Sequence, residues 1–256
     1  MDDLTLERTQ WDTFWLPDEA RAVDRAELGY TTSPADFPYL NNVYRARLSE
    51  HDVEPAIEEV VRAHQGRASR WSVVDASTPD SLTRQLEGAG YSAVHAHRAT
   101  WLSLDDWDDV STEHDARRVE DRATLEALLD VGAAAFGTTA RPDDAALDQQ
   151  VEACAPGKRV QRFVVFDGDR PVSGGGLNLY PDLGFGFLWA GGTVPDARGR
   201  GAYRALLGAR VRAAREAGLR AVGLYARVNT SLPIVQRLGF TTGGWMHAWD
   251  RPASAR

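Results

Sequence analysis

A glycine- and arginine-rich turn over residues 194–204 is the part of this sequence whose residue types could do chemistry most directly. Gly199 and Gly201 carry no side chain, so the backbone there can approach a ligand closely. The first N–H groups of a following helix lack partners inside that helix, and the helix dipole adds partial positive charge to them. The turn therefore predicts a binding site for an anion such as a diphosphate.

Two common phosphate-binding patterns do not describe this turn. The dinucleotide pattern GxGxxG needs a third glycine three residues after Gly201, and that position holds Arg204. A Walker A loop needs Gly-Lys-Ser/Thr, which is absent from the turn. An arginine-rich surface helix after an ordinary glycine turn is the plain alternative.

The elements on either side of the turn must position its backbone. An apolar run predicts a strand over 185–194, which Pro195 ends because proline donates no hydrogen bond to a neighbouring strand. A helix is predicted from Ala202 onward, with its arginines on the face opposite the apolar one. The apolar face comprises Tyr203, Leu206, Leu207, Val211 and Ala214.

The rest of the chain predicts a mixture of helices and strands. In the C-terminal half, helices are expected over 122–136 and from Pro142 to about Pro156, and strands over 160–166 and 171–180. Asp167-Gly168 between two apolar runs is typical of a hairpin. In the N-terminal half, helices are expected over 19–28, 53–64 and 79–88, and strands over 41–48, 70–75 and 92–104.

Two features predict how the chain is organised. The residues 86–91 resemble 237–240, since each group closes a short helix with a glycine before an alternating strand, which favours an internal repeat over coincidence. The acidic run 104–114 is the best linker candidate. We therefore predict an N-terminal domain over 1–108 and a second domain over 115–256.

Composition excludes several classes of function. With 256 residues, a net charge of −8 and a pI near 5.3, the chain does not favour nucleic acid and mildly favours a cationic partner such as an amine. Cys154 is the only cysteine, so no internal disulfide forms and a reducing compartment is expected. The N-terminus lacks the apolar segment of a signal peptide, and no run approaches 18 apolar residues. We expect a cytoplasmic protein without membrane contact.

Two motifs in the C-terminal half resemble those of a known protein family. The segment Arg198, Gly199, Arg200, Gly201, Ala202 resembles the Arg/Gln-x-x-Gly-x-Gly/Ala loop of the GNAT acetyltransferase superfamily, with Tyr203 where a small residue is usual. Downstream, NTSLPIVQRLGF over residues 229–240 resembles the short family helix that ends in Leu-Gly-Phe, and residues 219–226 between the two motifs fit the strand that the resemblance implies there. The resemblance covers roughly residues 119–249. It implies an α/β (α+β) GNAT fold: a mixed central sheet with splayed parallel strands, flanked by helices, plus a smaller degenerate GNAT-like N-terminal domain without the loop.

The resemblance also implies an activity and a binding site. An enzyme of this kind moves an acetyl group from acetyl-CoA directly to a primary amine, here of an unidentified small molecule or peptide, and needs no metal. The chain would act as a monomer or a homodimer. The residues implied to bind acetyl-CoA are Gly191, Gly192, Thr193, Val194, Arg198, Gly199, Arg200, Gly201, Ala202, Tyr203, Arg204, Asn229 and Ser231.

The catalytic groups of the family are harder to place. Val235 stands where many relatives have the tyrosine that protonates the leaving thiolate, and the strand over 185–194 holds no Asp or Glu to act as base. Tyr225, with Tyr203 as the alternative, is the predicted acid, and water is a further route for the proton. The missing groups also favour a second interpretation, a non-catalytic acyl-CoA-binding sensor. An unrelated α/β ligand-binding protein would require both motifs to be accidental.

Histidines offer alternative functional groups. His95 and His97 share one strand face, which suits a metal, but no third ligand stands at a sensible spacing. His247, between two tryptophans of the last strand, could face an acceptor. Packed or solvated histidines are the more common outcome at such positions.

Overall fold

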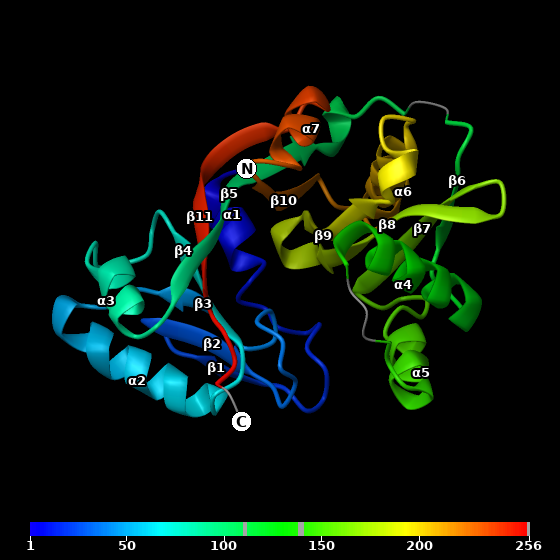
Figure 1. Ribbon diagram of the computed structural model, residues 1–256. Coiled ribbons are helices and arrows are strands. Elements are labelled where there is room, and N and C mark those ends of the chain that lie inside the picture. Colours follow the sequence, from blue (N-terminus) through cyan, green and yellow to red (C-terminus); the bar gives the residue numbers. More distant parts are fainter. Residues whose placement is uncertain (110–111, 138–140, 255–256) are drawn as a thin grey trace. The chain divides into compact units, whose positions relative to one another are not determined.

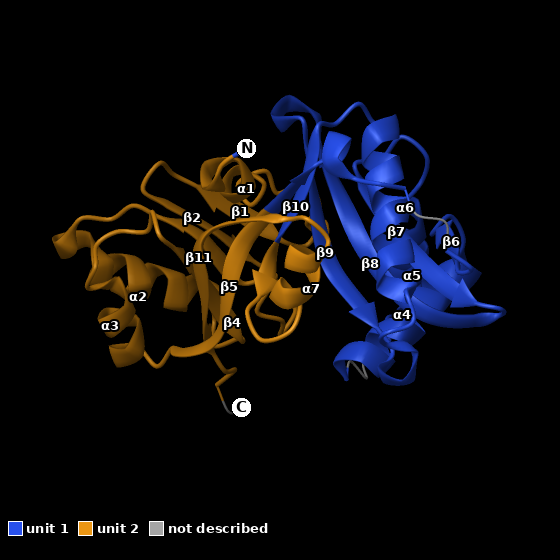
Figure 2. Ribbon diagram, turned by 90° about the horizontal axis from the view of Figure 1, so that it is seen from above, with its two compact units in different colours: residues 1, 101–224 blue, residues 2–100, 225–256 orange. Residues whose placement is uncertain are grey.

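A computed structural model describes residues 1–109, 112–137 and 141–254 and divides the chain into two compact units (Figure 1, Figure 2). Unit 1, blue in Figure 2, comprises Met1 and residues 101–224, and unit 2, orange, comprises residues 2–100 and 225–256. The chain passes from one unit to the other inside two strands, β5 (Ser92–Ser103) and β10 (Ala221–Arg227).

Unit 1 is a mixed sheet in the order β10–β9–β8–β7–β6 with helices on both faces. Its other strands are β6 (Asp115–Arg118), β7 (Val160–Asp167), β8 (Arg170–Tyr180) and β9 (Phe185–Thr193). Its helices are α4 (Arg122–Phe136), α5 (Asp144–Glu152) and α6 (Ala202–Glu216), with short 3-10 turns η2 (Leu104–Asp106), η3 (Pro181–Leu183) and η4 (Pro195–Ala197). β9 and β10 are parallel, and the remaining neighbours are antiparallel.

Consecutive glycines of β8 show that α4 and α6 cover opposite faces of this sheet. A Cβ built on Gly174 would face Leu128 of α4, and a Cβ built on Gly175 would face Arg210 of α6. Successive side chains of a strand point to opposite faces, so α4 and α6 enclose the sheet from its two sides.

The strands of unit 2 are also of mixed direction and follow the order β1–β2–β3–β4–β11–β5. Its other strands are β1 (Arg21–Asp24), β2 (Leu28–Thr32), β3 (Asn42–Ala46), β4 (Ser69–Val74) and β11 (Thr241–Arg251). Its helices are α1 (Asp3–Arg8), α2 (Val53–His64), α3 (Leu82–Gly88) and α7 (Leu232–Arg237), with a 3-10 turn η1 (Glu50–Asp52). Apolar side chains of α2 and α3 pack on Trp71 and Trp249 of the sheet in one core.

The order of elements repeats along the chain. Three antiparallel strands, a helix, a parallel strand, a helix and a final strand occur as β1–β2–β3–α2–β4–α3–β5 and again as β7–β8–β9–α6–β10–α7–β11. The second short helix of each copy ends alike, with left-handed Gly90 (φ +85°) and Gly239 (φ +88°). Tyr91 N–H donates to Leu86 O at 3.0 Å, and Phe240 N–H donates to Val235 O at 3.1 Å. These turns therefore support the predicted repeat with matching geometry.

Residues 19–28 do not form the predicted helix, and that prediction is wrong. They belong to the β1–β2 hairpin, in which Arg21 pairs with Thr32 and Asp24 with Gly29. The charged residues of this stretch show no alternation of apolar and polar side chains, and the pairing of β1 with β2 decides its structure instead. β6 was not predicted either, because its four residues contain a single apolar side chain, Ala116.

The compact units do not follow the predicted boundary between 1–108 and 115–256. β11, the last strand of the chain, pairs antiparallel with β4, from Met246 opposite Val74 to Arg251 opposite Ser69. This pairing places residues 225–256 in the same unit as residues 2–100. A prediction that divides the chain at a single point cannot show that its C-terminal residues join the N-terminal unit.

The predicted linker over 104–114 is attached to α6 in its described part. Leu104 and Trp107 are buried, and Arg215 donates to the Trp107 carbonyl at 2.9 Å and to Asp109 at 2.7 Å. Val110 and Ser111 of that prediction lie outside the described residues. The stretch up to Asp109 is therefore a packed part of unit 1, although its composition suggested a solvated run.

Candidate functional site

The parallel strands β9 and β10 separate, as the resemblance implied. Their pairing runs from Phe185–Ala221 to Phe187–Gly223, and in the described chain no further residue of β9 pairs with β10. From Leu188 to Thr193 the edge of β9 that faces away from β8 therefore keeps backbone N–H and C=O groups available. Such an edge can pair with the amide groups of an extended ligand.

A β-bulge bends β9 inside this free edge. Gly174 pairs with Gly192 and Gly176 with Trp189, so Ala190 and Gly191 together oppose the single residue Gly175. Ala190 has φ +47°, a conformation that is unusual for a residue with a side chain. Bulges redirect backbone groups and occur often beside active sites.

Glycines make the sheet thin at the bulge. A Cβ on Gly192 would lie 2.6 Å from the ring of Phe136 at the end of α4. A Cβ on Gly191 would lie 3.1 Å from the ring of Tyr203 on the opposite face. Side chains at these two positions would therefore have to displace Phe136 or Tyr203, so glycine is favoured where α4 and the start of α6 approach β9.

The glycine turn before α6 has the geometry of an anion site. Gly199 (φ +75°) and Gly201 (φ +90°) are left-handed, and a Cβ on Gly199 would meet nothing within 4 Å. α6 begins at Ala202, and no side chain caps it. The N–H groups of Ala202, Tyr203 and Arg204 therefore have no partner within the helix and point toward the exposed turn.

The arginines of the turn differ in how free they are. Arg198 Nε donates to the Thr193 carbonyl at 3.2 Å, which ties the turn to the end of β9. Arg200 lies 3.1 Å from Asp167 in an exposed ion pair, which offsets part of its charge. The backbone N–H groups and the helix dipole are consequently the constant part of the site, and the arginines add screened charge.

The equivalent helix of the first repeat has the opposite electrostatic character. α2 follows the acidic turn η1, and its N-terminus carries Glu50, Asp52 and Glu54 in place of glycines and arginines. Carboxylates already occupy the positive end of this helix dipole. The start of α2 therefore presents negative charge where the start of α6 presents glycines and arginines.

Arg210 is a functional candidate that the sequence did not reveal. It lies on the apolar face of α6, only 1% exposed, whereas the arginines of this helix were expected on the opposite face. Its Nη1 is 3.4 Å from the Gly176 carbonyl, while its Nε and Nη2 have no partner in the described chain. Burial lowers the pKa of Arg210, an effect that the neighbouring Tyr203 partly offsets. The helical spacing could have revealed this, because residue 210 follows Tyr203 by two turns and so lies on the same apolar face of the helix.

The remaining predicted site residues belong to unit 2. Tyr225 is largely buried, and burial together with the carboxylates of Glu7 and Asp3 raises the pKa of its hydroxyl above the usual range. Asn229 is exposed, and the hydroxyl of Ser231 accepts a hydrogen bond from Arg227 N–H at 2.8 Å. Val235 is fully buried in α7 and cannot serve as an acid. The structure thus groups Gly191–Val194 with Arg198–Arg204 in unit 1, and Tyr225, Asn229 and Ser231 in unit 2.

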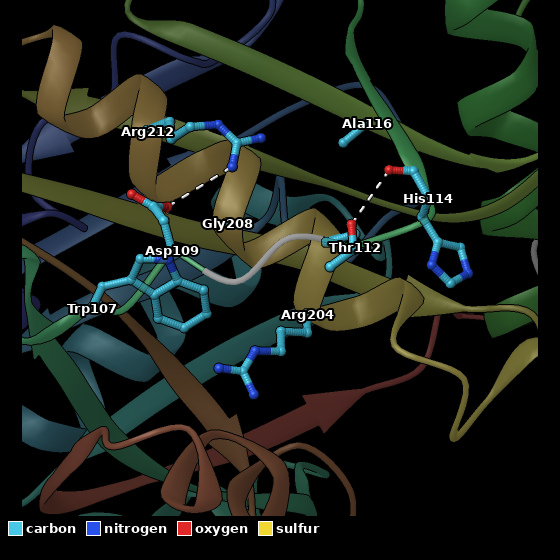
Figure 3. Close-up of a pocket in the computed structure, with 9 residues that line it drawn as sticks. Trp107, Asp109, Thr112, His114, Ala116, Arg204, Gly208 and Arg212 are labelled. Carbon is cyan, nitrogen blue, oxygen red and sulfur yellow. Dashed lines mark hydrogen bonds and ion pairs between the residues drawn. The ribbon is translucent and has the colours of Figure 1, made fainter.

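A small polar pocket lies on the side of α6 that faces Trp107, Asp109, Thr112, His114 and Ala116 (Figure 3). Arg204, Gly208 and Arg212, one helical turn apart, form one wall. Figure 3 shows Arg212 directed at Asp109, with 3.9 Å between the charged atoms, and Arg204 directed away from that pair. The side chains of Tyr203 and Arg210 do not line this pocket, which is therefore separate from the bulge of β9.

The histidine pair of β5 shows no sign of metal binding. His95 and His97 rings meet edge to face with centroids 6.1 Å apart. Burial and the cations Arg227 and Arg70 lower the pKa of His97 to about 4. Among residues 1–109, 112–137 and 141–254, no group of three or more potential ligands could hold a metal ion, and no helix is long and apolar enough to cross a membrane.

Comparison with known proteins identifies the fold and the family of the second copy. Residues 124–240 match the model of the acetyltransferase (GNAT) family. No curated protein matches the chain. A GCN5-related N-acetyltransferase from Kribbella flavida superimposes with a TM-score of 0.71 at 17% identity, over 98% of this chain and 95% of that one. One from Sphaerobacter thermophilus gives 0.63 at 18% identity, over 97% and 86%.

A further solved structure has two such domains in one chain. This tandem GNAT protein from the clavulanic acid biosynthesis pathway superimposes with a TM-score of 0.57 at 12% identity, over 94% of this chain and 86% of that one. Identities this low establish the fold alone, which agrees with the repeated order of elements found above. The chain therefore carries a GNAT acetyltransferase domain over residues 124–240, within a fold that it shares with a tandem GNAT protein.

Proposed function

We propose that this protein transfers an acetyl group from acetyl-CoA to a primary amine of a small molecule or a peptide. The observation that carries the proposal is the combination of two features in unit 1: the free edge of β9 after Phe187 and the glycine turn at Gly199–Gly201. The edge suits the amide groups of the pantetheine arm, and the turn suits the diphosphate. A single extended ligand that carries both groups is coenzyme A.

The reaction needs few protein groups beyond correct placement. The amine nitrogen attacks the thioester carbon, the carbonyl electrons move to oxygen, and their return expels the CoA thiolate. The nitrogen loses one proton and the thiolate gains one, so the products are an amide and free CoA. Tyr225 is the first candidate for the proton donor in this proposal, and Tyr203, beside Gly191, is the second. Burial and the carboxylates of Glu7 and Asp3 raise the pKa of the Tyr225 hydroxyl, so it stays protonated at neutral pH but is a weaker acid than an ordinary tyrosine.

Binding can be tested with one variant and a matched control. Gly201→Asp places a carboxylate and a strained side chain in the turn, so we expect the affinity for CoA, measured by calorimetry, to fall by more than about tenfold. Gly218→Asp is the control, because Gly218 is also left-handed (φ +72°) and also open, but lies beyond the other end of α6. Equal affinities of the two variants would overturn the proposed diphosphate site.

Turnover separates an enzyme from a sensor. The buried Val235 at the usual position of the acid favours the second candidate function, a non-catalytic acyl-CoA-binding sensor. Acetyl-CoA should be consumed in the presence of at least one member of a panel of primary amines, monitored by release of the free thiol. CoA binding without release across the panel would favour the sensor.

A further inference from the structure

The guanidinium of Arg210 is the least satisfied buried charge of unit 1. It is 1% exposed, and among the described residues no carboxylate pairs with it and two of its three nitrogens have no partner. Gln161, on a strand of the same sheet, likewise leaves its buried Oε1 without a partner in the described chain. A buried charge without a partner is costly and is rarely kept without a function.

The position of this charge connects it to the bulge of β9. A Cβ on Gly191 would lie 3.5 Å from Nη1 of Arg210, and one on Gly175 would lie 3.2 Å from it. Since neither glycine has a side chain, the guanidinium lies directly behind the backbone of the bulge. The ring of Tyr203 lies beside it, with its centroid 5.8 Å from Cζ of Arg210.

We propose that Arg210 is a positioning residue for acyl transfer, whose buried positive charge acts through the β9 bulge on the carbonyl oxygen of the bound thioester. The proposal rests on the proposed function and deepens it. As the amine attacks, the carbonyl oxygen gains negative charge and loses it again when the thiolate leaves. A fixed cation behind the backbone groups that contact this oxygen lowers the energy of that charged state, and a water-excluded setting screens the effect little.

Other charges near the site are less suited to this role. Arg198 and Arg200 are exposed, and Arg200 is paired with Asp167, so solvent and a carboxylate weaken their fields. They also follow the bulge by seven or more residues and lie in the turn where a diphosphate would bind. Arg210 is the cation that lies against Gly191 itself.

The experiment compares Arg210→Met, which keeps the length and removes the charge, with Arg212→Met on the exposed side of the same helix. We expect Arg210→Met to lower kcat by about tenfold or more, a smaller effect than the loss of a direct oxyanion donor. The affinity for acetyl-CoA, measured by calorimetry, should stay within about twofold of the wild type because the charge does not touch the ground-state ligand. Arg212→Met should change neither quantity. A fall in affinity that matches the fall in kcat, or an unchanged kcat, would overturn the proposal.

A second measurement does not require turnover. In acetyl-CoA labelled with ¹³C at the carbonyl, the infrared stretching frequency of the bound thioester should be lower than in water for the wild type, and should rise in Arg210→Met. A merely structural role would not move this frequency. If the variant does not fold, the wild-type spectrum decides, because a frequency equal to that in water contradicts the proposal. Failure of acetyl-CoA to bind at all would instead refute the proposed function.

Discussion

At the scale of single residues, this protein buries polar groups where the sequence gives little sign of them. Arg210 lies under the bulge of β9 in unit 1, and His97 is 7% exposed on β5 in unit 2. Nδ1 of His97 has no partner in the described part of the chain. Arg210 stays charged and His97 stays neutral at the expense of the stability of the fold. The protein should therefore respond measurably to substitution of these residues or to a change of pH.

The stability of the protein should fall as the pH drops from about 6.5 to 4 because of His97. Its pKa in the folded protein is about 4, below the ordinary 6.5, so the unfolded chain binds this proton more readily between the two values. Above pH 6.5 both states are neutral and the group contributes no slope. The full difference corresponds to roughly 3 kcal/mol.

Chemical unfolding at a series of pH values measures this effect. His97→Asn cannot take up the proton, so its free energy of unfolding should decline less steeply than that of the wild type between pH 6.5 and 4. His51→Asn, at an exposed position of η1, is the control and should follow the wild type. Parallel curves for the wild type and His97→Asn would contradict the expected proton uptake.

At the scale of elements, the sheet of unit 1 depends on glycines with different tasks. Gly176 of β8 lies under the ring of Trp189, whose Nε1 donates to Asn178 at 2.9 Å and whose face lies 5.6 Å from the guanidinium of Arg162. Gly132 of α4, in contrast, would meet nothing within 4 Å if it carried a Cβ. The first glycine is required by packing, and the second merely weakens its helix.

Alanine at these two positions should have opposite effects on stability. Gly176→Ala forces the Trp189 ring from its place, and overpacking of this kind costs about 1–3 kcal/mol. Gly132→Ala should stabilise the protein by about 0.5–1 kcal/mol, because it removes backbone freedom from the unfolded chain without a clash. Midpoints of denaturant unfolding give both values. A neutral Gly176→Ala would show that the ring can shift freely.

The sequence predicted most elements well and failed where side chains gave no pattern. α2 and α4 agree with their predicted bounds to the residue, since both have a continuous apolar face. β1 and β6 are short edge strands of charged residues, so their pairing partners alone define them. At the site, glycine spacing predicted the turn before α6, whereas the bulge at Ala190 and the burial of Arg210 depend on three-dimensional neighbours.

At the scale of the whole molecule, the C-terminal strand completes the sheet of the N-terminal residues. β11 pairs with β4, and Trp249 joins the core of α2 and α3. Arg70 and Asp250 clamp the two strands with a bidentate ion pair of 2.6 and 2.7 Å. The stability of residues 2–100 therefore depends on a strand that lies more than 140 residues later in the sequence.

Removing the charge of Asp250 should weaken unit 2 far more than removing that of an ordinary surface carboxylate. Asp250→Asn leaves the Arg70 guanidinium, whose side chain is 7% exposed, without a counter-charge. Loss of one partner of a buried pair costs about 3–5 kcal/mol, and we expect about 2–4 here because the side chain of Asp250 is 23% exposed. Asp115→Asn is the matched control, since its pair with Arg117 on β6 is about half exposed and should contribute less than about 1 kcal/mol.

Native-state hydrogen exchange of the full-length protein locates the effect. In Asp250→Asn, the amides of β4 and β11 that bond to each other should lose protection, because the clamp between their strands is broken. In Asp115→Asn those amides should exchange as in the wild type. If protection in β4 and β11 survives the loss of Asp250, hydrogen bonds and the Trp71–Trp249 core hold the strands together without the ion pair. The clamp would then serve only to select this pairing during folding.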